Sequence, residues 1–165
     1  MAIPTGYSRA QIALHWITAA LVAAQLVLHD PIEWAFDKSV ETGAFVFTAG
    51  GIAHLASGTL VLGLVMWRLI LRNERGAPAA PAGEPDWAKR VSRIAHLAFY
   101  ALLLALPITG AATWGVLSET GGDVHETLSN VLFALILAHV GAVLVHQFVW
   151  KTGLIRRMVA PEDDG

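Results

Sequence analysis

Four long apolar runs constrain this chain more than any other feature, because each is long enough to cross a lipid bilayer. A helix spans the hydrocarbon core with about 20 mostly apolar residues. We expect spans at about residues 11–29, 47–72, 88–113 and 124–150, with a flexible linker at residues 73–87 between the second and the third. The sequence therefore predicts one all-α domain over residues 1–165, a four-helix transmembrane bundle.

The composition agrees with a membrane protein and removes several kinds of site. Hydrophobic residues make up 55% of the chain and charged residues 15%, whereas soluble domains carry about 25% charged residues. The chain has no cysteine, which excludes disulfides, iron–sulfur clusters, thiolate zinc sites and covalently attached c-type haem. We expect a lipid bilayer around the chain and no nucleic-acid partner.

Basic residues fall almost entirely on one side of the predicted bundle. Lys38 is the single basic residue expected on the opposite side. That side carries the acidic residues Asp30, Glu33, Asp37, Glu41, Glu119, Asp123 and Glu126. Because lysine and arginine are retained in cytoplasmic loops, we expect both termini in the cytoplasm and two acidic loops outside, which face the periplasm if this is a bacterial inner-membrane protein.

All seven histidines lie in the predicted spans or at their edges. An ionisable side chain is costly in hydrocarbon, so a histidine in a span marks a functional site by default. Depth sorts the histidines into two layers. The inner layer holds His15, His96, His139 and His146, and the outer layer holds His29, His54 and His125.

The interval between His125 and His139 is the most informative spacing in the sequence. Their fourteen-residue separation corresponds to about 21 Å of rise and nearly four helical turns, so both imidazoles point from one face, one in each leaflet. Neutral imidazole is an axial ligand of haem iron. We expect two b-type haems, with His54 opposite His125 and His15 opposite His139; His96 remains an alternative partner of His139.

Other interpretations of these residues stay open. A single histidine in a membrane can simply hydrogen-bond a neighbouring helix, and His29 lies at a helix end beside Asp30, where we interpret it as interfacial. His146 suits a haem propionate or a quinone better than iron. Three arginines near the inner face can pair with propionates or merely follow the positive-inside rule: Arg9, Arg68 and Arg72. A divalent metal site at the outer surface is a further alternative, formed by His29, Asp30, Asp123, His125 and Glu126.

Short motifs in order along the chain give it a resemblance to the bacterial cytochrome b-561 family of small di-haem membrane cytochromes, which includes a superoxide oxidase. They cover residues 7–158: YSRAQIALHW at 7–16, IAH at 52–54 with Gly58, WRLILR at 67–72, HLAFY at 96–100, ALPITG at 105–110, HETLSN at 125–130 with His139, FVWK at 148–151 and LIRRM at 154–158.

The resemblance implies four haem ligands, paired as His15 with His139 and His54 with His125. It also implies electron exchange with quinone, ubiquinone as the expected substrate, and a place for His96 beside the inner haem or a quinone. The chain departs from the superoxide-oxidising member in a short outer connection at residues 117–123 and in acidic outer loops. A negative surface repels an anion, so these loops favour a basic periplasmic donor protein over superoxide.

Three functions follow from this pattern. We expect transmembrane electron transfer between a periplasmic donor and the quinone pool. The alternatives are a haem-binding membrane anchor subunit of a periplasmic dehydrogenase or cytochrome complex, and a superoxide:quinone oxidoreductase, which would make the chain a quinone-linked enzyme.

Overall fold

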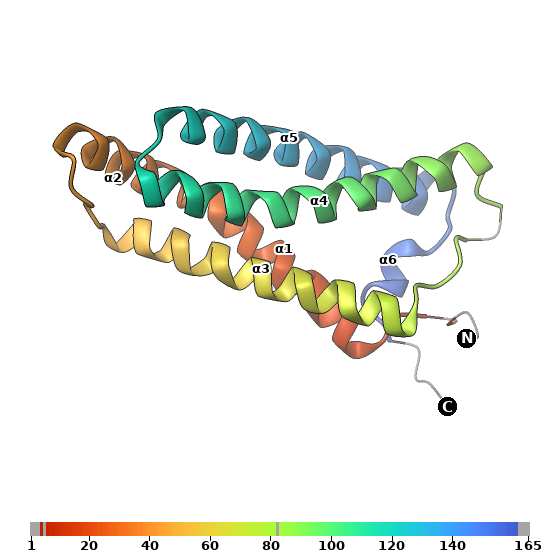
Figure 1. Ribbon diagram of the computed structural model, residues 1–165. Coiled ribbons are helices and arrows are strands. Elements are labelled where there is room, and N and C mark those ends of the chain that lie inside the picture. The colour runs from red at the N-terminus through yellow and green to blue at the C-terminus, as the bar shows by residue number, and fades with distance from the viewer. Residues whose placement is uncertain (1–3, 5, 82, 162–165) are drawn as a thin grey trace.

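The computed structural model describes residues 4, 6–81 and 83–161, and every regular element in them is a helix. Five long or medium helices follow one another along the chain, and a π-helical turn and a short helix end it (Figure 1). Their bounds are α1 (Arg9–Val27), α2 (His29–Thr42), α3 (Ala49–Arg75), α4 (Asp86–Val116), α5 (Glu119–Leu144), η1 (Val145–Val149) and α6 (Leu154–Arg157).

The expected all-α membrane bundle is confirmed. By length and composition, α3, α4 and α5 with η1 can each cross a membrane. The first crossing differs from a single straight span, because α1 and α2 meet the same test only as a pair, bent by 54° at the break between them. With that pair counted as one span, the number of spans is four.

Hydroxyl side chains fix where three of the spans begin. Ser8, Thr48 and Ser118 each accept a hydrogen bond from a backbone N–H in the first turn of α1, α3 and α5. Such caps satisfy donors that have no partner within the helix. At α1 the cap is reciprocal, because the Gln11 side chain accepts from the backbone N–H of Ser8.

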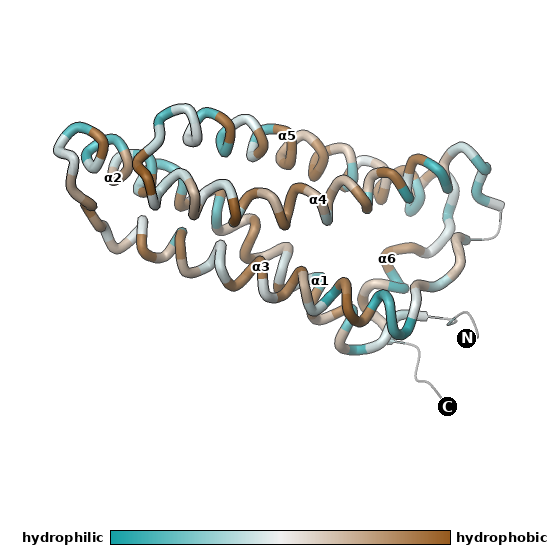
Figure 2. Tube along the Cα trace, in the orientation of Figure 1, coloured by the Kyte–Doolittle hydropathy of each residue, from teal (hydrophilic) through white to brown (hydrophobic). Residues whose placement is uncertain are grey.

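The tightest packing lies halfway along the bundle. Val61 and Val65 of α3 pack there against Leu103 and Leu106 of α4 and Leu132 of α5. Hydrophobic residues also run along the outside of the helices, and hydrophilic residues gather at the two ends (Figure 2). This distribution is typical of a bundle whose outer surface faces lipid rather than water.

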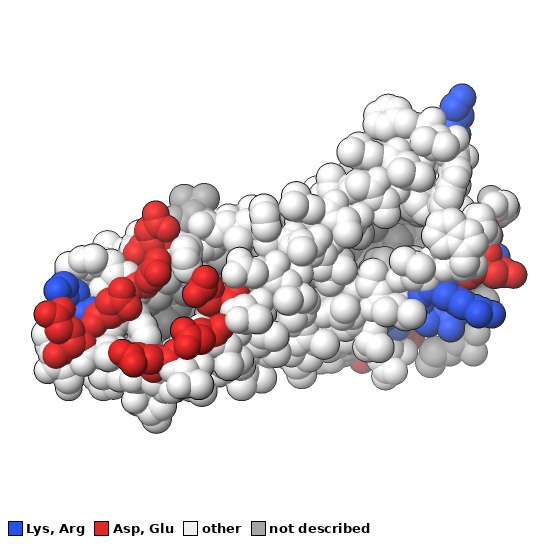
Figure 3. Space-filling view, turned by 90° about the horizontal axis from the view of Figure 1, so that it is seen from above, with Lys and Arg blue, Asp and Glu red and all other residues white. Residues whose placement is uncertain are grey.

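Opposite charges gather at opposite ends of the molecule. Acidic side chains cluster over the end that holds α2, and basic side chains lie mainly at the end that holds the linker and both termini (Figure 3). The linker is held against the bundle at two points: Gln11 Nε2 donates to the Gly76 carbonyl at 3.1 Å, and Arg157 Nη1 donates to the Ala79 carbonyl at 2.8 Å. We call these the acidic end and the basic end.

Candidate functional site

Near the acidic end, α3 and α5 bring the rings of His54 and His125 close together in an edge-to-face arrangement. Their ring centroids lie 6.4 Å apart with an angle of 65° between the planes. An imidazole nitrogen binds a metal at about 2 Å and lies roughly 1 Å from its ring centroid, so two axial imidazoles on one metal ion hold their centroids about 6 Å apart. The separation of His54 and His125 therefore fits one iron between them, as the sequence predicts.

Two residues of α4 orient His125. Thr109 Oγ1 lies 3.2 Å from His125 Nδ1 and donates its own proton to the Ala105 carbonyl at 2.9 Å. A hydroxyl with its proton engaged can only accept, so Nδ1 of His125 carries the hydrogen and Nε2 keeps its lone pair for a metal. Gly110 makes room for this ring, because a Cβ at that position would lie 3.0 Å from His125 Cε1.

His54 has a ring nitrogen that is available to bind a metal. Its Nδ1 is buried and has no hydrogen-bond partner among the described residues, and the same is true of Gln25 Oε1 on α1. Gln25 Nε2 donates to the His54 carbonyl at 3.1 Å, which ties α1 to α3 at this depth. Buried polar atoms are rarely left unpaired, so the unpaired atoms suit a polar or metal-bearing group between the helices.

Near the basic end, three histidines and an arginine form the inner cluster. His139 of α5 lies 5.9 Å from His96 and 5.3 Å from Phe99, measured between ring centroids. Arg68 Nη2 lies 3.3 Å from His15 Nδ1. His15 also lies within electrostatic range of both His139 and His96. The structure thus collects all the inner-layer ligand candidates at one depth.

His96 is oriented like a metal ligand in this cluster. Its Nδ1 lies 2.6 Å from the Ser92 carbonyl, an acceptor, so Nδ1 carries the hydrogen and Nε2 is free. The spacing of His96 and His139 also fits a shared iron. Both pairings of His139 weighed on the sequence, with His15 and with His96, therefore remain proposals.

The predicted basic partners of the inner layer occupy three different settings. Arg68 points inward, and its Nη2 lies within hydrogen-bond distance of His15 Nδ1. The Arg72 guanidinium lies over the Tyr100 ring, 5.8 Å from its centroid. Arg9 is exposed in the first turn of α1. Of the three, Arg68 lies closest to the candidate iron ligands.

His29 and His146 lie outside the two histidine pairs. His29 is exposed, and its Nε2 lies 3.5 Å from Glu33 Oε2. The ligand atoms of His29, Asp30 and Glu33 all lie within 4.8 Å of one another, which differs from the outer metal set expected from the sequence, because His125 faces His54 instead. His146 is buried within the protein, with 8% of its surface exposed.

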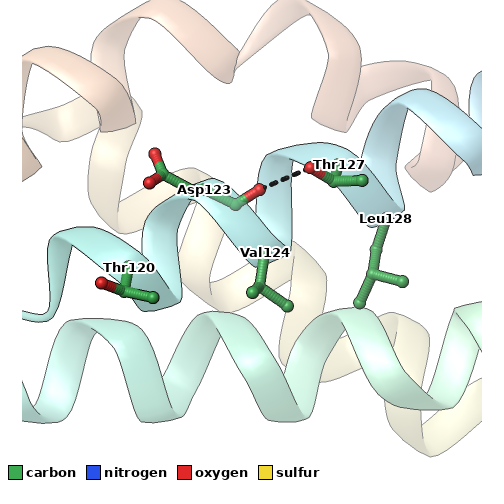
Figure 4. A pocket seen from close by; sticks show the side chains of 5 residues that line it. All are labelled: Thr120, Asp123, Val124, Thr127 and Leu128. Atoms are coloured by element: carbon green, nitrogen blue, oxygen red, sulfur yellow. Dashed lines mark hydrogen bonds between the residues drawn. The ribbon is translucent and has the colours of Figure 1, made fainter.

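Two open grooves mark the lipid-facing side of α4 and α5 near the acidic end. One, of about 230 Å³, is lined by Thr120, Asp123, Val124, Thr127 and Leu128 (Figure 4). The other, of about 290 Å³, extends along α4 from Thr109 to Val116. The second groove includes Thr109, whose hydroxyl lies against His125.

Sequence reasoning missed the residues that orient the histidines. Thr109 and Gly110 belong to the ALPITG motif, but their role depends on α4 and α5 packing at this register. Ser92 lies four residues before His96, a spacing at which a helical side chain can reach that carbonyl, and this spacing was the available signal. Glu84, which the fold buries beside His146, has no motif at all.

Comparison with known proteins identifies the family of this chain. The sequence profile of prokaryotic cytochrome b561 matches residues 6–161. Cytochrome b562 of Cereibacter sphaeroides is 31% identical, over 94% of this chain and 96% of that protein. Cytochrome b561 homolog 1 of Escherichia coli K12 is 29% identical over 93% and 96%, and a probable superoxide oxidase of Yersinia pestis is 25% identical over 93% and 95%.

Proposed function

Since this chain belongs to the prokaryotic cytochrome b561 family, whose members bind b-type haem in the membrane and transfer electrons, we propose that it holds two haem b groups and connects a periplasmic donor with the quinone pool. The observation that carries the proposal is the His54–His125 pair, whose ring separation of 6.4 Å fits one iron. The inner cluster offers a second site on the same helix, at His139.

The haems supply one-electron redox chemistry, and the protein sets where that chemistry occurs. His54 and His125 would hold the outer group, His139 would hold the inner one with His15 or His96, and Arg68 would pair with an inner propionate. Leu132 lies seven residues from both His125 and His139, in the buried apolar layer with Val61 and Val65. That layer excludes water between the two sites, so electrons can cross while ions cannot.

The charge distribution supports one orientation in the membrane. Basic residues gather at the end that holds the termini and acidic residues at the other (Figure 3). By the positive-inside rule this distribution favours both termini in the cytoplasm of a bacterial cell and α2 in the periplasm. The periplasmic donor then approaches an acidic surface beside the outer haem. A basic electron-transfer protein has the complementary charge, and such complementarity raises association rates.

Superoxide oxidation is the second candidate, because a similar protein is named a probable superoxide oxidase. The acidic end argues against superoxide as a physiological donor, since an anion is repelled there. Stopped-flow reduction of the oxidised protein by superoxide and by a cationic cytochrome c at low salt separates the two. Faster reduction by superoxide would replace the protein donor in this proposal.

Substitution of His125 tests the haem assignment. We expect His125→Ala to lose the outer haem and keep the inner one, so the pyridine haemochrome content should fall from two to about one per chain. His29→Ala is the matched control, because His29 is exposed and lies outside both pairs. Two haems retained in His125→Ala would remove His125 from the ligand set.

A further inference from the structure

A carboxylate is buried beside a histidine at the basic end, away from both proposed haem sites. Glu84 comes from the linker and His146 from η1, and they are 7% and 8% exposed. Glu84 Oε1 lies 3.7 Å from His146 Nε2, just beyond direct hydrogen-bond distance. Glu84 is the only buried carboxylate in the part of the chain that the structure describes. A buried charge is costly unless it is paired, so this pair needs an explanation.

The hydrogen bonds around His146 show how its ring can face Glu84. Thr152 Oγ1 donates to the His146 carbonyl at 3.3 Å and lies 3.1 Å from His146 Nδ1. When the hydroxyl proton goes to the carbonyl, Nδ1 is the donor in the second contact. In a neutral His146 the lone pair of Nε2 then faces the Glu84 carboxylate. Two acceptors facing each other in a buried site repel, and one proton between them removes the repulsion.

The pair lies between the inner cluster and the aqueous phase. His146 follows His139 by seven residues, about 10 Å of helical rise. A π-helical turn spans Val145–Val149, and such turns are rare and frequent at functional sites. The Trp150 ring covers His146 at 4.5 Å between centroids. On the other side, Glu84 is followed after one residue by Asp86, whose side chain is 86% exposed.

The other charged groups at this end have their own settings. Asp86 Oδ1 pairs with Lys89 Nζ at 3.0 Å. On α6, which packs against η1, Arg157 donates to the Ala79 carbonyl, and Arg156 is exposed. Lys151 follows η1 and is also exposed. None of these described side chains contacts Glu84 or His146, so Glu84 and His146 face each other without a third charged partner from this group.

We propose that Glu84 and His146 form a proton-delivery pair for quinone reduced at the basic end. The proposal rests on the quinone-linked function above. Each quinone takes two electrons, delivered one at a time from the inner haem, and two protons to become quinol. The pair passes one proton with each electron and is reloaded from the inner aqueous side through Glu84, so charge balances at every step. In quinol oxidation the same pair accepts the protons.

The test compares Glu84→Gln with Asp86→Asn in proteoliposomes that contain a short-chain ubiquinone. Both substitutions remove one carboxylate from the same end, but Asp86 is exposed. A positioned proton donor contributes roughly 100-fold or more to rate, so we expect kcat for quinone reduction to fall about 100-fold in Glu84→Gln, with unchanged KM and haem content. Asp86→Asn should match the wild type. Glu84→Asp should restore part of the rate and shift its pH profile.

A spectroscopic measurement on the unaltered protein gives a readout independent of turnover. Infrared difference spectra between the quinone and quinol states should contain a protonated-carboxyl band that shifts with ¹³C-labelled glutamate. If Glu84→Gln keeps its haems and matches wild-type quinone kinetics, or if the labelled protein shows no such band, the proton-delivery role is wrong. If the wild type holds its haems yet never reacts with quinone, the proposed function itself fails.

Discussion

At the scale of single residues, the geometry of the outer histidine pair depends on how closely α4 approaches it. A Cβ added at Gly110 would lie only 3.0 Å from His125 Cε1. We therefore expect Gly110→Ala to push the His125 ring away from His54, at a cost of about 1–3 kcal/mol typical of overpacking. Haem titration of the apoprotein should show weaker binding of one haem and unchanged binding of the other.

Gly115→Ala is the control for this prediction, because it lies on the same helix and a Cβ there meets nothing within 4 Å. Equal haem binding by both variants would mean that Gly110 does not define the outer site.

A second prediction at the scale of residues concerns Thr109. Thr109→Val removes the hydroxyl that accepts from His125 Nδ1 while keeping the side-chain shape. Loss of such a partner typically costs 10–100-fold in metal affinity, so the outer haem should bind more weakly and its midpoint potential should move. Thr127→Val is the comparison, since its hydroxyl bonds only the Asp123 carbonyl of its own helix; a shift of the same size in both would contradict the role of Thr109.

The residue scale also shows what the sequence can and cannot reveal. His54, His125 and His139 were predictable because the helical repeat converts their spacing into depth and direction. The orientation of His125 by Thr109, and the burial of Glu84 beside His146, arise from contacts between segments distant in sequence. No local pattern encodes such contacts.

At the scale of elements, the break between α1 and α2 is the feature that sequence reasoning missed. Asp30 and Pro31 were interpreted as the end of a span, but proline is tolerated in the first turn of a helix, and the chain restarts as α2 at His29. The start of α3 is packed against this restart, because a Cβ on Gly50 would lie 2.5 Å from Pro31 Cβ.

We expect Gly50→Ala to displace α2 and lower the thermal stability of the protein. Gly63→Ala, also on α3, meets nothing within 4 Å and should be neutral or slightly stabilising, because alanine favours helix by up to about 1 kcal/mol over glycine. Circular dichroism melts in the same detergent compare the two variants. A melting temperature for Gly50→Ala that equals or exceeds that of Gly63→Ala would show that this contact does not hold α2 in place.

At the scale of the whole molecule, the separation of charge between the two ends sets the proposed topology. The chain has no cysteine, so single cysteines at exposed Ala44 and Asn73 report each end without background. In intact cells from which the outer membrane has been removed, a membrane-impermeant maleimide should label Ala44→Cys and spare Asn73→Cys until the membrane is broken. The reverse pattern would invert the bundle and place the acidic end in the cytoplasm.

The two-layer arrangement of histidines is the central claim, and one measurement tests it most directly. A reduced-minus-oxidised absorbance spectrum of the detergent-purified protein, calibrated by pyridine haemochrome, counts the b-type haems on each chain. We predict two, one for the His54–His125 pair and one for the inner cluster around His139. A folded, haem-supplied protein that binds only one haem in repeated preparations would contradict the two-layer arrangement of haem ligands.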